Sequence, residues 1–388
     1  SLPSRGLGDV YKRQTYKLFY FLVLVLFLRV DLVFENNTPT GGDMGAHIVA
    51  IDTFIKEFIP NFQINGWSND WFSGYPLYYF YFPLPAIITF FFNLIFPFGV
   101  AFKIMVVMSM ILVVYSIEKL MRNTPNQISI FGATAGLFYV FTESFTIYGG
   151  NLASTLAGQF SFAYSLAFAN LSIFYLIKSK NNFRFPISST FLALCLLSHL
   201  IPFIIYSPIY AFYWLSKKQN LNQRVLSISI FLGLVSRWSV SLLVNLEYTT
   251  NMSYTPFSKL EDLIKEDILP MVFILISLLV VKRKNLIKNK TYNIFNFYII
   301  SSSVLLYFFV PEGALWNGRL IPFFNLGVVF LFFKAIEIFI EDIDLFQHGV
   351  SVLTITFLGG TIYCLYIFYE KWSNNQSVSY THLTLPTT

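Results

Sequence analysis

Two side chains that could move a proton stand close together near the start of the chain. Asp43 and His47 belong to the stretch GGDMGAH, residues 41–47, which follows the first long apolar run. Apolar residues recur at positions 44, 48, 51, 54, 55 and 58, which predicts an amphipathic helix beginning at Asp43. The two side chains then share one helix face, one turn apart. We expect a catalytic role, with Asp43 as a base and His47 orienting it or contacting a phosphate. The simpler interpretations are a helix N-cap and a packed histidine.

A second polar stretch, TESFTIYGGNLAS, begins at Thr142, where another apolar run ends. Glu143 is a candidate ligand, together with Asp43, for a divalent ion such as Mg²⁺ or Mn²⁺. Two glycines and Asn151 then open the next helix, and free backbone N–H groups at such a position suit a phosphate. The alternative is an ordinary glycine turn with Asn151 as its N-cap.

Three cations could bind an anionic substrate. Lys103 lies in the first turn of a predicted span, and Arg319, in WNGRLIPF, begins another. With Asn151, these two form the predicted site for a donor phosphate. The alternatives are that Lys103 extends to the membrane surface and that Arg319 pairs with Glu312. Arg237 lies within a span, where we expect a buried structural ion pair.

Aromatic residues crowd the segment after the first predicted helix, NGWSNDWFSGYPLYYFYFPLP. Aromatic rings stack on sugars and sit well at a membrane interface. We expect Trp67, Trp71 and Tyr75 to line a substrate groove. His199, in the sequence SHLIP between two short apolar runs, is expected to join them.

The composition identifies the elements that must position these residues. The chain has 388 residues, of which 55% are hydrophobic and 12% charged. Soluble domains carry about 25% charged residues, and apolar runs of about 20 residues span a bilayer. We therefore expect an all-α integral membrane protein with about 11 transmembrane helices. The predicted spans are 16–34, 100–119, 127–142, 152–177, 186–199, 202–215, 225–246, 268–282, 293–310, 319–338 and 350–369.

The apolar segment 83–98 decides the topology. Pro83, Pro85 and Pro97 bound it, and we predict a short interfacial or re-entrant helix because proline ends helices. With this assignment most loop lysines and arginines fall on one side, which the positive-inside rule makes cytoplasmic. The long first loop, residues 35–99, then faces outward from a bacterial cytoplasmic membrane, with the candidate site on that face.

Both ends of the chain are expected to be foreign to the protein. DVYKRQ and VSYTHL are translations of the two strands of a sequencing adapter, so we set residues 1–14 and 378–388 aside. We divide the rest into an N-terminal membrane module, residues 15–246, and further transmembrane helices, residues 247–377, which we expect to be truncated.

The formal net charge is +6, and the basic residues form no stripe with interleaved aromatics. Nucleic acid is therefore not expected as a partner. Cys195 and Cys364 lie in apolar runs and are expected to be core residues.

The motifs GGDMGAH, GWSNDWFSGYPLYYFYFPLP, ESFTIYGGNLASTLAGQFSF, SHLIP and WNGRLIPFF together resemble a family of bacterial multispanning proteins. That family carries the label "6-pyruvoyl-tetrahydropterin synthase-related". The order of parts is also similar to the GT-C superfamily of glycosyltransferases, which use sugars linked to polyprenyl phosphate. This resemblance implies that Asp43 is the acid of the first outer loop, that Glu143 takes the place of a second acidic motif, and that Arg319 holds the lipid phosphate. The sequence departs from the pattern in its single acid at TES and in Gln159, which stands where an acid is expected and to which we assign no role.

Three functions remain open at this stage. The first is a membrane glycosyltransferase that uses a polyprenyl-phosphate sugar donor, with the bilayer and an unidentified glycan, lipid or protein acceptor as its other partners. The second is a transporter or flippase of a lipid-linked or amphiphilic substrate, although no internal repeat is evident. The third is a non-catalytic protein of envelope assembly, which would tolerate loss of Asp43.

Overall fold

The computed structural model describes residue 25 and residues 28–70, 73–122, 130–142, 147–177, 184–217, 220–250, 255–264, 290–311 and 315–342. Their helices are α2 (Val30–Val33), α3 (Met44–Thr53), η1 (Phe54–Phe58), η2 (Ile59–Asn61), α4 (Leu84–Asn93), α5 (Phe98–Met121), α6 (Ile130–Phe141), α7 (Leu152–Ser154), η3 (Thr155–Gln159), α8 (Phe160–Ile177), α9 (Arg184–Ser198), α10 (Leu200–Ser216), α11 (Leu221–Val244), η4 (Leu246–Tyr248), α12 (Leu260–Leu263), α14 (Lys290–Phe309), η5 (Asn317–Leu320) and α15 (Ile321–Asp342). Two short strands, β1 (Gly66–Ser68) and β2 (Tyr75–Leu77), pair antiparallel with Trp67 opposite Pro76.

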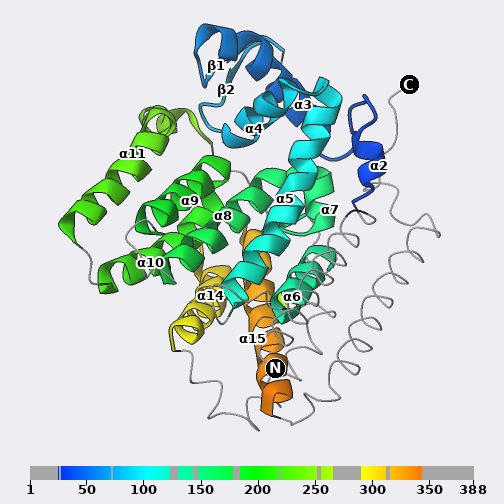
Figure 1. The fold of residues 1–388 in the computed structure, drawn as a ribbon. Coiled ribbons are helices and arrows are strands. Elements are labelled where there is room, and N and C mark those ends of the chain that lie inside the picture. Colours follow the sequence, from blue (N-terminus) through cyan, green and yellow to red (C-terminus); the bar gives the residue numbers. More distant parts are fainter. Residues whose placement is uncertain are drawn as a thin grey trace, which may run out of the picture.

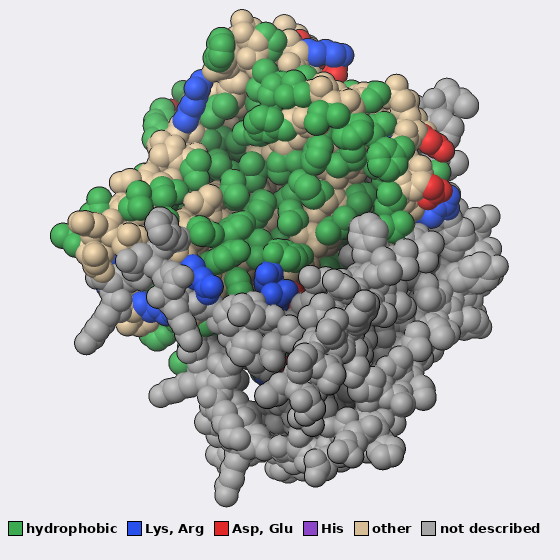
Figure 2. All heavy atoms as spheres, viewed as in Figure 1, with side chains coloured by type: hydrophobic (Ala, Val, Ile, Leu, Met, Phe, Trp, Pro, Cys, Tyr) green, Lys and Arg blue, Asp and Glu red, His purple; other side chains and the backbone are tan. Residues whose placement is uncertain are grey.

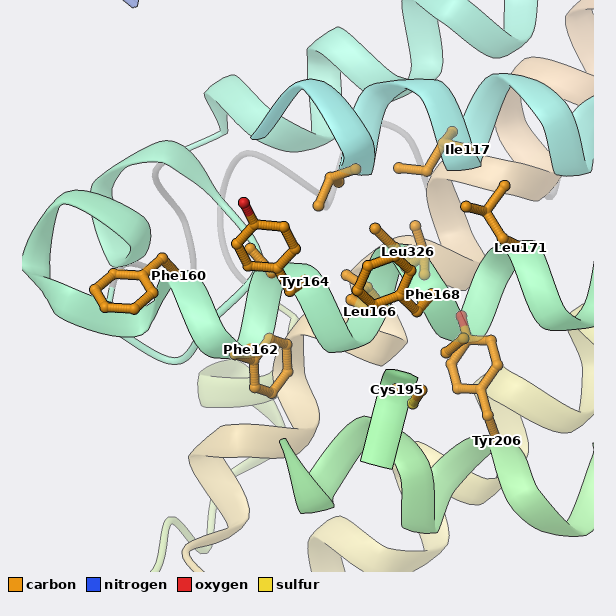
Figure 3. Close-up of a cluster of buried hydrophobic side chains, with 14 of the residues drawn as sticks. Ile117, Phe160, Phe162, Tyr164, Leu166, Phe168, Leu171, Cys195, Tyr206 and Leu326 are labelled. Carbon is orange, nitrogen blue, oxygen red and sulfur yellow. The ribbon is translucent and has the colours of Figure 1, made fainter. Parts of the chain in front are cut away.

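Helix α8 is the centre of the bundle and packs against α5, α9 and α10 (Figure 1). Its residues 160–174 are all buried, and Phe160, Phe162 and Phe168 lie in the hydrophobic cluster shown in Figure 3. Small residues between these rings let neighbouring helices approach closely. The hydroxyl of Ser165, for example, donates to the carbonyl oxygens of Cys195 and His199 at 2.9 and 2.8 Å. A helix that is apolar on all sides is one that other helices surround.

The architecture is the expected all-α membrane type. Among the described residues, four helices are long and apolar enough to cross a membrane: Phe98–Met121, Leu152–Ile177, Leu221–Val244 and Asn317–Glu337. Shorter apolar helices stand at the predicted spans 127–142, 186–199, 202–215 and 293–310. Most of the first predicted span, the spans at 268–282 and 350–369, and both chain ends lie outside the described residues. The total of about 11 spans and the division at residue 246 therefore stay predictions.

The first loop forms a cap of α3, α4 and the β1–β2 hairpin on one end of the bundle (Figure 1). Met44, Ile51, Phe54 and Phe58 turn inward and are almost fully buried. These are positions of the predicted amphipathic pattern, so the helix and its inward face are confirmed. The pattern continues into η1, where the helix becomes π-helical.

Helix α4 is too short to cross a membrane. Its 10 residues correspond to about 15 Å, against a hydrocarbon core of about 30 Å. Pro83 precedes the helix, Pro85 lies in its first turn and Pro97 follows. The predicted short, proline-bounded helix is confirmed, while its depth in the bilayer stays a prediction.

Hydrophobic side chains cover the middle of the face shown in Figure 2, with charged side chains toward the edges of the described surface. Helix α11 belongs to this apolar exterior, since only 17% of its most apolar 18-residue stretch is buried inside the protein.

The prediction that Arg237 forms a buried ion pair is wrong. Arg237 is exposed, and its Nη2 donates to the carbonyl oxygen of Phe62 in the first loop at 2.8 Å. Only one side of α11 meets the bundle, and Arg237 is not on it.

Candidate active site at the first loop

Asp43 stands at the start of α3 with its carboxylate exposed. It occupies the N-cap position, but its side chain accepts no capping hydrogen bond. Its backbone N–H donates instead to the carbonyl oxygen of Ala157, at 3.0 Å. The simple capping interpretation therefore does not describe what this carboxylate does. The main chain anchors the residue and leaves the acid available for chemistry.

The segment that anchors Asp43 is a break in a long helix. Within η3, two residues before α8 begins, Gly158 has φ +107°, a conformation that favours glycine. A Cβ atom at Gly158 would lie 2.9 Å from the Cβ of Asp43 and 3.2 Å from Cδ2 of His47. The backbone of the break therefore lies directly against both residues of the GGDMGAH motif.

His47 is held between two aromatic rings. Its ring centroid lies 4.7 Å from that of Phe160 and 5.5 Å from that of Tyr81. Burial lowers the pKa of His47 from 6.5 to about 4, while the nearby carboxylate of Asp43 and a hydrogen bond with the Gly158 backbone act in the opposite direction. The imidazole is therefore neutral at physiological pH. It is both a packed histidine and a neighbour of Asp43, so the two interpretations of the sequence do not exclude each other.

Tyr81 is the site residue that the sequence analysis missed. Its pKa is raised to about 12, chiefly by burial and also by the carboxylate of Asp43, against the opposing effects of the Ser161 hydroxyl and Arg319. The phenol therefore lies within electrostatic reach of both the acid and the cation. Its backbone carbonyl accepts the indole N–H of Trp238 on α11 at 2.9 Å, which fixes this part of the first loop. The run YYFYF contains several similar aromatic residues, and nothing in the sequence distinguishes Tyr81 among them.

Arg319 reaches the same region from η5. Its Nη1 donates to the carbonyl oxygens of Ile147 and Tyr148, at 3.1 and 3.2 Å, and to Oε1 of Gln159 at 2.8 Å. The guanidinium thus joins the second polar stretch to the helix break. Gln159, to which the sequence analysis gave no role, is one of its partners. The predicted alternative partner, Glu312, lies outside the described residues.

The other two predicted phosphate ligands are committed to structural contacts. Nζ of Lys103, which is buried, donates to the carbonyl oxygens of Leu32 and Glu35 and to Oδ1 of Asn37, at 2.6 to 2.7 Å. An ammonium group has three N–H donors, so all of them are occupied.

Asn151 is also fully buried. Its Oδ1 accepts the N–H of Ser154 and its Nδ2 donates to the carbonyl of Thr142, both at 2.8 Å. Its side chain is thus the predicted N-cap. Binding of a phosphate by Lys103 or Asn151 stays an untested prediction, and neither residue enters the proposal below.

The predicted groove residues divide between the surface and the interior. Trp67 is 60% exposed and packs over Gly74 across the hairpin, and Tyr75 is partly buried in β2. His199 caps α10 with Nδ1, which accepts the N–H of Ile201 at 3.2 Å, and its ring stacks on Phe82 with centroids 4.9 Å apart. Trp71 lies outside the described residues.

A metal site is not assembled by the described residues alone. Among them, no group of three or more His, Cys, Asp or Glu side chains is placed to hold an ion. Glu143 lies outside the described residues, so the predicted Mg²⁺ or Mn²⁺ site with Asp43 stays a prediction.

The geometry defines a helical membrane protein in which an acid, an imidazole and a phenol of the first loop gather near a guanidinium of η5. No protein-family model matches the chain, and the search of curated proteins also found no match. Among solved structures, the chain is similar to ArnT from Cupriavidus metallidurans in the apo state, with 13% sequence identity and a TM-score of 0.49. The match covers 91% of this chain and 64% of ArnT, so the chain spans less than two thirds of that protein. At this level of similarity, no activity or substrate transfers from ArnT to this chain.

Proposed function

We propose that the protein is an integral-membrane glycosyltransferase of GT-C type. It takes a sugar from a polyprenyl-phosphate donor at the outer face of the bacterial cytoplasmic membrane. The observation that carries the proposal is the exposed carboxylate of Asp43, anchored through its main chain and placed in one electrostatic neighbourhood with Tyr81 and Arg319. The motif resemblance to GT-C enzymes points to the same acid.

The chemistry needs one base and one anion-stabilising group. An acceptor hydroxyl attacks the anomeric carbon of the donor sugar as the bond from that carbon to the phosphate oxygen breaks. The hydroxyl proton passes to the carboxylate of Asp43. The leaving polyprenyl phosphate gains negative charge, which the Arg319 guanidinium stabilises. Tyr81, whose raised pKa keeps it a phenol, would offer a hydrogen-bond donor in the neighbourhood of Asp43 and Arg319.

The surroundings suit a substrate that is part sugar and part lipid. Trp67 and Tyr75 of the hairpin supply aromatic faces for the sugar. The apolar exterior of α11 and the short helix α4 support the proposal that lipid lies beside the first loop. We propose that the prenyl chain stays in the bilayer while its phosphate reaches the site.

The experiment that tests this function compares Asp43→Asn with Asp52→Asn. Both residues belong to the same helix segment, but Asp52 forms a surface ion pair with Lys56 at 2.7 Å. The full chain in liposomes receives a panel of radiolabelled polyprenyl-phosphate sugars with a mixture of acceptors, including water. We expect Asp43→Asn to lower release of sugar from the lipid by about 100-fold or more, and Asp52→Asn to leave it within about two-fold. Equal release by the wild type and Asp43→Asn would overturn the proposal.

A transporter is the second candidate, because polar groups are buried in the paired helices α14 and α15. Lys334 and Glu337 form an ion pair in the protein interior. Asn296 and Asn325 are fully buried, and their side-chain atoms have no hydrogen-bond partner in the described part of the structure. Intramembrane polar residues of this kind often mark substrate or ion pathways. In the same liposomes, movement of intact donor lipid across the bilayer without loss of sugar would favour this function.

A further inference from the structure

Six consecutive residues, 157–162, approach the parts of the candidate site one after another. The contacts are Ala157 with Asp43, Gly158 with Asp43 and His47, Gln159 with Arg319, Phe160 with His47, and Phe162 with His199, while the Ser161 hydroxyl acts on the pKa of Tyr81. Continuous helices present every third or fourth residue to one neighbour. Here the helix is interrupted, and adjacent residues face several site elements within a short distance along the chain.

The interruption has a physical cause at Gly158. Its φ of +107° is strained for any residue with a Cβ atom. Gly158 lies within the π-helical turn η3, whose backbone is wider than that of an α-helix, and such turns occur often at functional sites. A Cβ atom at Gly158 would also press against Asp43 and His47, at 2.9 and 3.2 Å. Conformation and space therefore both require glycine.

The break makes backbone carbonyl groups available to the first loop. In a regular α-helix these carbonyl oxygens face along the axis toward N–H groups four residues later. Here the Ala157 oxygen accepts the N–H of Asp43 at 3.0 Å, and the Gly158 backbone lies against the imidazole of His47. The two residues of the GGDMGAH motif thus lie against adjacent residues of one helix.

We propose that Gly158 is a positioning residue of the active site, and that the helix break sets the distance of Asp43 and His47 from Arg319. Gln159, next to the break, holds the guanidinium. Gly158 has no side chain that could touch substrate, so it acts by positioning its neighbours Asp43 and His47. The catalytic meaning of this arrangement rests on the proposed glycosyltransferase function, but the arrangement itself can be measured without any turnover.

The test uses Gly158→Ala in the full chain, with Gly45→Ala as the matched control. Gly45 lies in α3 between Asp43 and His47, and a Cβ atom there would meet nothing within 4 Å. Each variant is treated with diethyl pyrocarbonate at pH 7, and the acylation rate of His47 is measured by peptide mass spectrometry. We expect Gly158→Ala to raise this rate by about three-fold or more, because the ring loses its packed position, and Gly45→Ala to leave it unchanged.

A second variant, Gly42→Ala, disturbs the contact between the start of α3 and the helix break from the α3 side. A Cβ atom at Gly42 would lie 2.4 Å from the carbonyl oxygen of Ala157, so Gly42→Ala separates α3 from the break without straining Gly158. We expect the same faster labelling of His47. If both Gly42→Ala and Gly158→Ala label like the wild type, the positioning role is wrong. This variant also keeps the test decisive if Gly158→Ala does not fold.

Measurement of sugar release distinguishes the positioning role of Gly158 from the proposed glycosyltransferase function. If the donor is cleaved, both variants lower kcat by about 10-fold or more because a misplaced base transfers protons poorly. Absence of sugar release in the wild type, together with faster labelling in the variants, would refute the glycosyltransferase function and retain the positioning role. Normal release together with faster labelling would refute the link between position and catalysis.

Discussion

Arg319 donates from Nη1 to Oε1 of Gln159 at 2.8 Å, across 160 residues of sequence. The contact joins η5, which leads directly into α15, to the helix break that contacts the first loop. Because the same guanidinium also bonds the carbonyl oxygens of Ile147 and Tyr148, three separate stretches of the chain meet at one side chain. In the proposed reaction, these contacts hold the guanidinium where it would stabilise the leaving phosphate.

Arg319→Lys and Arg319→Gln should differ in a defined way. Lysine retains the charge but lacks the planar set of donors that reaches several oxygens at once. We expect Arg319→Gln to lower kcat/KM for a polyprenyl-phosphate sugar by about 100-fold and Arg319→Lys by about 10-fold. Initial rates in liposomes measure both. Equal rates for Arg319→Gln and the wild type would remove Arg319 from the mechanism.

Loss of the Tyr81 hydroxyl should affect catalysis more than folding. We expect Tyr81→Phe to lower kcat by about 10-fold, because it removes a donor beside Asp43 and Arg319 while the ring still packs on His47. The apparent Tm in detergent should change little. Tyr79→Phe, in the same aromatic run, is the control and should behave like the wild type. A normal rate in Tyr81→Phe would show that the phenol only packs.

Lys103 should matter for stability and not for donor binding. Lys103→Met leaves the oxygens of Leu32, Glu35 and Asn37 without their shared donor, at a cost of about 2–4 kcal/mol. We expect a lower apparent Tm and an unchanged KM for the donor. Lys56→Met, at an exposed ion pair, should change neither. A large rise in KM with normal stability would instead restore the phosphate-binding role predicted from sequence.

His47 should make the protein less stable as the pH falls. Its pKa is about 4 in the folded protein and 6.5 in the ordinary state, so the unfolded chain binds more protons between these values. The contribution to stability is complete above about pH 6.5 and is lost as the pH falls toward 4, by up to about 1.4 kcal/mol per unit. Apparent Tm measured from pH 7 to pH 4 should fall less steeply for His47→Gln than for the wild type. Parallel curves would contradict the depressed pKa.

Much of the fold could be predicted because its causes are local. Apolar runs locate α5, α6, α8, α11, α14 and α15, and the prolines around residues 83–97 account for the short helix α4. The buried positions of α3 follow from their spacing along the helix. These features depend on hydrophobic periodicity and on backbone chemistry that each segment carries by itself.

The internal arrangement of the site depends on tertiary contacts and could not be predicted. The segment TLAGQF resembles any apolar helix containing a glycine, and the break at Gly158 becomes visible only when α3 lies against it. The acceptors of Lys103 are mainly backbone oxygens, which no sequence pattern reveals. The exposure of Arg237 depends on which side of α11 meets α9. In each case a neighbour distant in sequence decides the outcome.

The contact between Gln159 and Arg319 also has a consequence for how the protein is made. At about 5–20 residues per second, roughly 8–30 s pass between synthesis of these two residues. During that interval the first loop and the helix break exist without the guanidinium that completes the site. For the proposed glycosyltransferase, a nascent chain halted in this window would carry Asp43 but would lack the cation assigned to the departing phosphate. Under that proposal, competence to consume donor lipid is acquired late in biosynthesis, only after η5 has been synthesised.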